Sequence, residues 1–327
     1  MRAVTVVQPS ADPRNLVVQD MPMPEPGPRQ VRVKVHAVSI NPVDWKLAES
    51  GHPRWARPHV LGLDAAGVID AVGADVTRWQ PGQRVAWHGD LSRPGVFAEY
   101  ALADDHVLAT MPDDLSYEAA AALPCAGMTA YQGLFRKARL EAGQTVLVQG
   151  ASGGVGGFAV QLAKRAGANV IALSSPAKAG RVRHLGADEV LDYRAPDLKE
   201  QVRSLTGGYG ADVMVEIAKP ADARSSLELV HYNGHLVCID PLPNLQDVPA
   251  YTYAASIHEV ALGGAYAAGY VPTQRDFAVM LADLLGRVSS GELDPMIEHR
   301  VGLDEIPVYL HRLRQGELAG KTVATLA

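Results

Sequence analysis

The chain has 327 residues, enough for two domains, and its 47% hydrophobic and 20% charged residues are typical of a soluble globular protein. The formal net charge of −6 disfavours a general affinity for nucleic acid, which needs a basic surface. No apolar run reaches the roughly 18 residues of a membrane span, so we expect no membrane partner.

Predicted strands dominate the first third of the sequence. Residues 30–39 (QVRVKVHAVS) follow a proline-rich linker and alternate apolar with polar side chains, as a half-buried strand does. Further short strand-like runs, separated by glycine and proline, lie at 1–7, 61–73, 82–90 and 95–103. This spacing predicts a compact, barrel-like β domain.

The pattern changes at about Ser116, where an alanine-rich helical segment begins that Pro124 interrupts. Strand-like and helix-like segments then alternate, which predicts a doubly wound parallel sheet. A helix is expected at 273–290, and the strand-like end at 320–327 is expected to return to the N-terminal domain. We expect the strands of the parallel sheet at 145–149, 169–173, 189–192, 212–216, 235–239 and 260–263.

The segment 145–168 (TVLVQGASGGVGGFAVQLAKRAGA) predicts a dinucleotide site. Ala151, Gly153 and Gly156 reproduce the G-x-G-x-x-G spacing, with alanine in the first place, between a predicted strand and an amphipathic helix. The second glycine lets backbone N–H groups approach a pyrophosphate, and the third lets helix and strand pack closely. The diphosphate would lie at the helix N-terminus, where unpaired N–H groups favour an anion.

The residues after the second strand of this sheet favour NADP(H) over NAD(H). NAD-binding proteins carry an acidic residue there, but no Asp or Glu stands between Val170 and Asp188. Hydroxyl and cationic side chains suit a 2′-phosphate, which a carboxylate would repel. They are supplied by Ser174, Ser175, Lys178, Arg181 and Arg183, although the two arginines could equally lie on a solvated helix face.

The sequence predicts no zinc site. His231 and His235 are four residues apart, but Asn233 and Gly234 between them are typical of a helix end, so no helix presents both rings on one face. The two cysteines, Cys125 and Cys238, exclude a four-thiolate site and a disulfide framework. We therefore expect a reducing, cytoplasmic environment, and no secretory signal.

Several segments together resemble the zinc-independent quinone oxidoreductase branch of the medium-chain dehydrogenase/reductase superfamily, the group that contains ζ-crystallin. The resemblance covers nearly the whole chain. It implies an α/β protein with a GroES-like β-barrel domain at 1–120, completed by 265–327, and a Rossmann domain at 121–264. The segments that carry it are HAVSINPVDWKLAESG (36–51), LGLDAAGVIDAVG (61–73), PGQRVAW (81–87), GVFAEYALA (95–103), LPCAGMTAYQGL (123–134), VQGASGGVG (148–156) and GKTVA (320–324).

The resemblance also implies site residues. Zinc-dependent members of the superfamily have a metal-binding Cys where this chain has Asn41, and a metal-binding His where it has Leu63. Cys125 matches their third ligand, and one thiolate cannot hold a catalytic zinc alone. Thr129 is implied as a contact on the nicotinamide side. The other implied cofactor contacts are Ser152, Gly153, Gly154 and Val155 at the pyrophosphate, and Ser174, Lys178 and Tyr193 at the 2′-phosphate.

The implied chemistry is hydride transfer from NADPH to a quinone or an enone, which is electrophilic without a metal. Asn41 and Lys46 are the candidate catalytic residues: Asn41 would donate to the acceptor oxygen or the carboxamide, and Lys46 would stabilise developing negative charge. Either could instead be structural, Asn41 in a turn and Lys46 in solvent. We expect Asp44 to orient its neighbours, because an unperturbed carboxyl is ionised at neutral pH.

Three alternatives remain open at this point: an alkenal or enoyl reductase of the same fold, a largely non-catalytic NADPH-binding protein, and a zinc alcohol dehydrogenase, which Asn41 and Leu63 disfavour. Four tyrosines gather within twenty positions and would line either an acceptor pocket or a subunit interface. The family pairs the strand near 260–263 across a two-fold axis, so we expect a homodimer. The tyrosines are Tyr251, Tyr253, Tyr266 and Tyr270.

Overall fold

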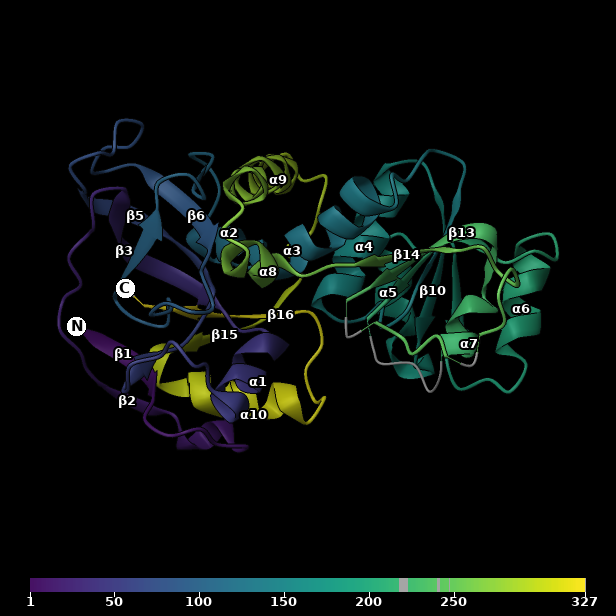
Figure 1. The fold of residues 1–327 in the computed structure, drawn as a ribbon, viewed down its shortest axis with the longest axis horizontal. Coiled ribbons are helices and arrows are strands. Elements are labelled where there is room, and N and C mark those ends of the chain that lie inside the picture. The colour runs from purple at the N-terminus through teal and green to yellow at the C-terminus, as the bar shows by residue number, and fades with distance from the viewer. Residues whose placement is uncertain (218–222, 240–241, 247, 327) are drawn as a thin grey trace. The chain divides into compact units, whose positions relative to one another are not determined.

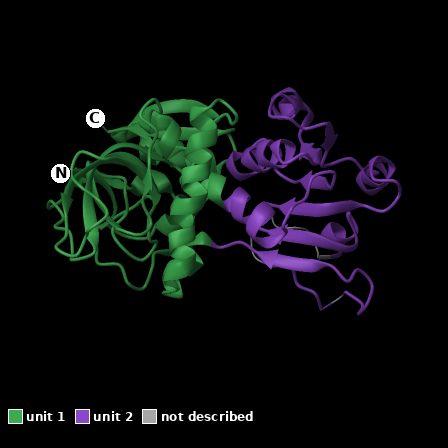
Figure 2. Ribbon diagram, turned by 90° about the horizontal axis from the view of Figure 1, so that it is seen from above, with its two compact units in different colours: residues 1–128, 262–327 green, residues 129–261 purple. Residues whose placement is uncertain are grey.

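The computed structural model describes residues 1–217, 223–239, 242–246 and 248–326, and the chain divides into two compact units (Figure 2). Unit 1 consists of Met1–Met128 and Leu262–Ala327, and unit 2 of Thr129–Ala261. Unit 2 is therefore an insertion in the sequence of unit 1. Each unit has its own sheet system, which the following paragraphs describe separately.

Unit 1 is built on mostly antiparallel β-structure (Figure 1). One sheet has the strand order β15-β16-β3-β5-β6-β8, with β7 also paired to β3, and a smaller one has the order β2-β1-β4. The strands are β1 (Arg2–Val6), β2 (Val17–Asp20), β3 (Gln30–Ser39), β4 (His59–Val60), β5 (Asp64–Val72), β6 (Arg84–His88), β7 (Tyr100–Asp104), β8 (Ala109–Thr110), β15 (Ile297–Gly302) and β16 (Lys321–Thr325).

The helices of unit 1 lie around these sheets, and α9 packs on β6 and β8. Within the described residues, no helix combines the length and apolar character needed to cross a bilayer. Short 3-10 turns occur at η1 (Pro13–Asn15) and η4 (Leu303–Glu305). The helices are α1 (Pro42–Ser50), α2 (Tyr117–Ala121), α3 (Pro124–Tyr131), α8 (Leu262–Ala267), α9 (Val271–Ser289) and α10 (Ile306–Arg314), of which α3 crosses into unit 2.

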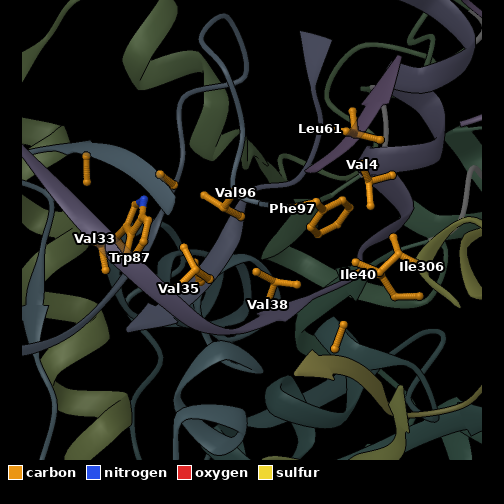
Figure 3. Close-up of a cluster of buried hydrophobic side chains, with 14 of the residues drawn as sticks. Val4, Val33, Val35, Val38, Ile40, Leu61, Trp87, Val96, Phe97 and Ile306 are labelled. Atoms are coloured by element: carbon orange, nitrogen blue, oxygen red, sulfur yellow. The ribbon is translucent and has the colours of Figure 1, made fainter. Parts of the chain in front are cut away.

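The core of unit 1 follows from the alternation in β3. Val31, Val33 and Val35 are buried between more exposed neighbours, as the sequence predicts for a half-buried strand. The register with β5 shifts between Val35 and Ala37, and the strand is buried continuously from there to Ser39. Figure 3 shows Val33, Val35 and Val38 in one buried cluster with Trp87 on β6 and with Leu61 and Phe97, which lie between strands.

The last strand completes the sheet of unit 1. β16 lies between β15, to which it is parallel, and β3, to which it is antiparallel. The closing segment therefore joins the N-terminal β domain, where the sequence placed it. Val323 faces Ser39 in the register, so the start of β16 lies beside the end of β3. This pairing brings residues from both ends of the chain to one place.

The described part of unit 2 contains one parallel sheet in the order β11-β10-β9-β12-β13-β14. Together with unit 1 it forms the α/β architecture that the sequence predicts. The strands are β9 (Thr145–Val148), β10 (Asn169–Ser174), β11 (Glu189–Asp192), β12 (Ala211–Glu216), β13 (Val230–Cys238) and β14 (Ser256–Glu259). The helices are α4 (Gly154–Arg165), α5 (Ala179–His184), α6 (Leu198–Leu205) and α7 (Ala223–Leu227), with a π-helix η2 (Gln132–Lys137) and a 3-10 turn η3 (Pro176–Lys178).

Two expectations for this sheet are wrong. The last strand ends at Glu259 instead of beginning at 260, and helix α8 occupies part of the predicted strand. The Asn233-Gly234 pair lies inside β13 and ends no helix. Asn233 has a φ of +67°, and the register between β12 and β13 shifts there, so the pair forms an irregularity within the strand.

The glycine pattern does form a tight turn between β9 and α4. Gly153 is the N-cap of α4, and the helix is buried at every position from 156 to 163, more than the one apolar face predicted. An added Cβ on Gly156 would meet Gly150 O at 2.3 Å and Ala151 Cα at 2.7 Å, so only glycine permits this packing. An added Cβ on Gly153 would meet only Gly150 O, at 3.4 Å, which is an ordinary van der Waals contact, so the packing itself does not require glycine there.

Replacing Gly156 with valine is expected to lower the free energy of unfolding by about 2 kcal/mol, because the new side chain must displace backbone atoms. Chemical denaturation measures this loss. The matched control is Gly180→Ala on α5, where an added Cβ meets nothing within 4 Å. That control should leave stability unchanged or slightly raised. Equal losses in the two variants would contradict the packing argument.

Candidate active site

Unit 2, described by itself, contains the turn that begins α4. Ser152, Gly153, Gly154 and Val155 are all partly exposed, while Gly156 is buried. The first N–H groups of a helix have no partner within it, so this end can receive an anion. The four residues predicted at a pyrophosphate are therefore adjacent and partly accessible.

The end of β10 carries the residues predicted at a 2′-phosphate. Ser174 is the last residue of β10 and only 4% exposed, while Ser175 and Lys178 follow it and are partly exposed. Tyr193, which is 50% exposed, directly follows the neighbouring strand β11. Because Ser174 pairs with Asp192 in the parallel register, the structure brings Ser174 and Tyr193 to the same sheet edge.

Sequence reasoning missed two charged residues at this edge. Asp192 puts a carboxylate at the end of β11, beside the end of β10. Arg194 follows closely, with its Nε 3.9 Å from Asp192 Oδ1 and its guanidinium 4.9 Å from the centre of the Tyr193 ring. Arg194 therefore offsets the Asp192 charge and adds a cation to the edge. Thr129, the remaining predicted cofactor contact, lies buried on α3.

Unit 1, described by itself, contains a buried polar cluster, which is formed by Asn41, Asp44, Asp64, Cys125 and Lys321. Lys321 Nζ donates to Asn41 Oδ1 at 2.6 Å, and Asn41 Nδ2 donates to Asp64 Oδ2 at 2.8 Å. Asp64 Oδ1 accepts the backbone N–H of Cys125 at 2.9 Å. The cluster thus joins the end of β3, the start of β5, the start of α3 and the start of β16.

Asp44 caps this arrangement from helix α1. Its Oδ2 accepts the backbone N–H of Asn41 at 2.7 Å, while its Oδ1 is buried without a hydrogen-bond partner among the described residues. Asp44 therefore orients its neighbour, as expected. The sequence analysis assumed that the Asp44 carboxyl has an ordinary pKa and is ionised. That assumption is wrong, because burial raises the pKa of Asp44 well above the usual range.

The charge state of Asp64 is set by opposing effects. Burial raises its pKa to about 6, against the pull of the Lys321 ammonium, whose Nζ lies 3.9 Å from Asp64 Oδ2. Two buried carboxyls therefore share one ammonium. This cluster holds more potential negative charge than Lys321 alone compensates.

The two predicted catalytic residues lie differently. Asn41 is 2% exposed, and its second amide hydrogen contact is to Ser39 O at 3.3 Å, so both of its N–H bonds are used within the protein. Lys46 is exposed on α1, with its Nζ 5.9 Å from the centre of the Trp45 ring. The structure brings Asn41, but not Lys46, into the buried polar cluster.

Three side chains with metal-binding atoms also meet here, a convergence that the sequence did not reveal. Asp64 and His88 face each other across β5 and β6, and Cys125 completes the group. One ligand atom from each lies within 4.8 Å of the others. His88 Nδ1 is buried without a partner among the described residues, and burial lowers the pKa of this imidazole to about 4. We refer to these three residues as the donor triad.

The four tyrosines are divided between the two units. Tyr266 packs against Phe277 in unit 1 and donates its hydroxyl to His88 O at 2.5 Å. Tyr270, in the same unit, is exposed, and Tyr251 and Tyr253 belong to unit 2, where Tyr251 is 95% exposed.

Comparison with known proteins identifies the family of this chain. Residues 27–113 match the alcohol dehydrogenase GroES-like domain, and residues 154–283 match the zinc-binding dehydrogenase domain. The human quinone oxidoreductase is 31% identical over 94% of this chain and 92% of its own length. The chain belongs to the quinone oxidoreductase family of the medium-chain dehydrogenase/reductase superfamily. It is an oxidoreductase, and this family implies a nicotinamide cofactor.

Solved structures agree with this family. A quinone oxidoreductase from Pseudomonas syringae pv. tomato DC3000 superimposes with a TM-score of 0.88, at 28% identity over 99% of both chains. A structure described as a putative zinc-dependent alcohol dehydrogenase from Rhizobium etli CFN 42 superimposes with a TM-score of 0.89, at 30% identity over 99% of this chain and 98% of the other. The family fold therefore accompanies more than one described activity, and the site residues must distinguish them.

The residues of this family member fit a nicotinamide dinucleotide but not zinc at the superfamily's usual ligand positions. The partly exposed start of α4, with Gly153 as its N-cap, suits a diphosphate. Leu63, by contrast, is apolar and 2% exposed, and Asn41 is held by Lys321 and Asp64. Neither position supplies a zinc donor of the kind the site would need.

Replacing Lys321 with methionine is expected to lower the free energy of unfolding by about 3 kcal/mol, because Asn41 Oδ1 loses its donor and Asp64 loses its counter-charge inside the protein. Chemical denaturation in the presence of a chelator measures this. Lys164→Met is the matched control, since Lys164 pairs with Asp188 at the surface and each side chain is more than 40% exposed. The control should change stability by less than about 1 kcal/mol, and a Lys321 variant as stable as the control would contradict the assigned role.

Proposed function

We propose that this quinone oxidoreductase family member transfers a hydride from NADPH to a quinone or a similar conjugated carbonyl acceptor, without a Lewis-acid metal in the hydride step. The observation that carries this proposal is the donor chemistry at positions 41 and 63. An isolated ketone gains little polarisation from an amide and a leucine, whereas a quinone or an enone is already electrophilic. The names of the relatives in the family support the same acceptor class.

The preference for NADPH rests on the edge formed by β10 and β11. Ser174 and Lys178 offer a hydroxyl and an ammonium where NAD-binding proteins carry a carboxylate. Arg194 adds a cation beside Tyr193. Because a 2′-phosphate accepts charge-assisted hydrogen bonds, these groups favour it over a bare ribose hydroxyl.

The chain's own residues would orient the acceptor and stabilise charge. Lys321 holds Asn41 Oδ1, which fixes the amide with its N–H groups turned away from Lys321. On binding an acceptor, Asn41 would exchange its longer contact, the 3.3 Å bond to Ser39 O, for the acceptor oxygen. Lys46 would supply positive charge near the developing oxyanion, and solvent would supply the proton.

A homodimer is part of this proposal. β14 is the terminal strand of the sheet in unit 2, and Val260 N–H donates to Cys238 O on β13. Alternation along the strand therefore turns the N–H groups of Ile257 and Glu259 away from β13, where a second copy of the strand would satisfy them. Sedimentation of the purified chain as a monomer at micromolar concentration would overturn this part.

The proposed function is tested by following NADPH oxidation with a 1,4-quinone, an alkenal and a simple ketone, with NADH in parallel. Turnover of the quinone that persists in a chelator and prefers NADPH is the expected result. Faster turnover of the alkenal would assign the alkenal or enoyl reductase alternative instead. Chelator-sensitive turnover of the ketone would indicate zinc alcohol dehydrogenase chemistry, and cofactor binding without turnover a non-catalytic protein.

Replacing Lys178 with alanine is expected to raise the KM for NADPH about tenfold, because one charge-assisted hydrogen bond to the 2′-phosphate is lost. The KM for NADH should stay unchanged, because NADH has no 2′-phosphate. Steady-state kinetics with both cofactors measure this. Lys199→Ala is the matched control, because Lys199 lies on α6 and pairs with Glu228. If the variant bound NADPH and NADH with equally increased KM values, the Lys178 ammonium would not contact the 2′-phosphate.

A further inference from the structure

Helix α9 has a second apolar face besides the one that is buried in unit 1. Phe277 and Met280 belong to the buried face and are 1% and 0% exposed. Val279, by contrast, is 58% exposed, and Ala278 and Ala282, which share its side of the helix at helical spacing, are also accessible. This second face borders a hollow of about 470 Å³ in unit 1, a volume typical of small-molecule sites. We refer to this space as the α9 hollow.

The α9 hollow combines apolar walls with cationic side chains. The described residues that line it include two arginines and no acidic residue. Arg78 comes from the loop between β5 and β6, and Arg275 from the second turn of α9. The apolar lining consists of Leu108, Ala109, Ala278, Val279 and Ala282, and no lining residue is a candidate cofactor or catalytic residue.

Side-chain contacts hold the walls of the α9 hollow in place. Trp79 Nε1 donates to Asp105 O at 2.7 Å, which ties the loop that carries Arg78 to the turn before β8. The Arg78 guanidinium lies 5.3 Å from the centre of the Trp79 ring. His106 Nε2 is bonded to Gln274 Oε1 at 2.7 Å, which ties the same turn to α9. The hollow is therefore formed by the fold itself and does not depend on a ligand for its shape.

We propose that the α9 hollow binds a small organic anion with an apolar tail, of the chemical class of a free medium-chain carboxylate. Among the described residues, neither Arg78 nor Arg275 forms an ion pair, so both guanidinium groups are available to a carboxylate. The two cations stand out in a chain whose net charge is −6. Charge complementarity therefore favours an anion over a neutral or cationic occupant.

The apolar face of α9 sets the length of the tail. Arg275 and Ala282 are seven positions apart, which corresponds to about 10 Å along the helix axis. An extended octyl chain matches this length, so a carboxylate bound at Arg275 would lay its tail over Val279 and Ala282. Covering Val279 would remove an exposed apolar side chain from water. This binding site does not rest on the proposed hydride acceptor, and its test needs no turnover.

The direct test is a calorimetric titration of the full-length chain with octanoate, in saturating NADPH so that the cofactor site is occupied. The expected result is one equivalent bound. Acetate has the charge without the tail, and octyltrimethylammonium has the tail with the opposite charge. Both should bind at least tenfold more weakly than octanoate. Equal affinity for octanoate and octyltrimethylammonium would overturn the proposal, because the arginines would then contribute nothing.

Substitutions at exposed positions locate the site. Arg275→Gln should raise the Kd for octanoate about tenfold, because a charge-assisted hydrogen bond is lost. Val279→Glu should raise the Kd more than tenfold, because it sets a carboxylate against the ligand. The matched controls lie elsewhere in unit 1: Arg300→Gln on β15 and Val308→Glu on α10, where Val308 is 49% exposed. Both controls should bind octanoate as the wild-type chain does.

The remaining outcomes are also decisive. No binding of millimolar octanoate by the wild-type chain, or wild-type affinity in either Arg275→Gln or Val279→Glu, would overturn the proposal. Phosphatidylcholine vesicles that contain phosphatidylglycerol test a lipid surface as the source of the anion. Sedimentation of the chain with these vesicles, lost in Arg275→Gln and unaccompanied by octanoate binding, would assign the α9 hollow to a membrane and so reject a free carboxylate.

Discussion

The hydrogen bond from Lys321 to Asn41 is the interaction on which the rest of the polar cluster depends. It fixes the amide orientation of Asn41, and that orientation lets Asn41 donate to Asp64. Asp64 in turn accepts the backbone of Cys125 at the start of α3. Removing water from the two carboxyls of Asp44 and Asp64 costs free energy. The hydrogen bonds of this cluster offset that cost and so allow both carboxyls to be buried.

Much of the fold is readable from the sequence because its signals are local. The alternation lies within β3, and the strand-turn-helix pattern around Gly156 runs from Thr145 to Arg165, so both signals are local, and the structure has both. The errors arise where a local signal has two readings. Asn233 tolerates a positive φ at a helix end and inside an irregular strand alike, and only the pairing of β13 with its neighbours decides between them.

The candidate site residues also divide into those that a local sequence pattern locates and those that it does not. Ser152 to Val155 and Ser174 follow strand ends, which sequence locates well. Lys321 was not identified as a partner of Asn41, since 280 positions separate them and no short-range pattern links the two. The place of His88 opposite Asp64 comes from the register of β5 and β6, which hydrophobic alternation leaves undetermined.

The position of β16 has a consequence for the order in which the molecule is made. Unit 2 is complete once Ala261 has been synthesised, whereas the buried carboxyls of unit 1 meet their ammonium only when Lys321 and the strand it begins have left the ribosome. Vectorial synthesis therefore lets unit 2 fold first. The polar cluster forms only after Lys321 has been translated, so its assembly depends on both segments of unit 1.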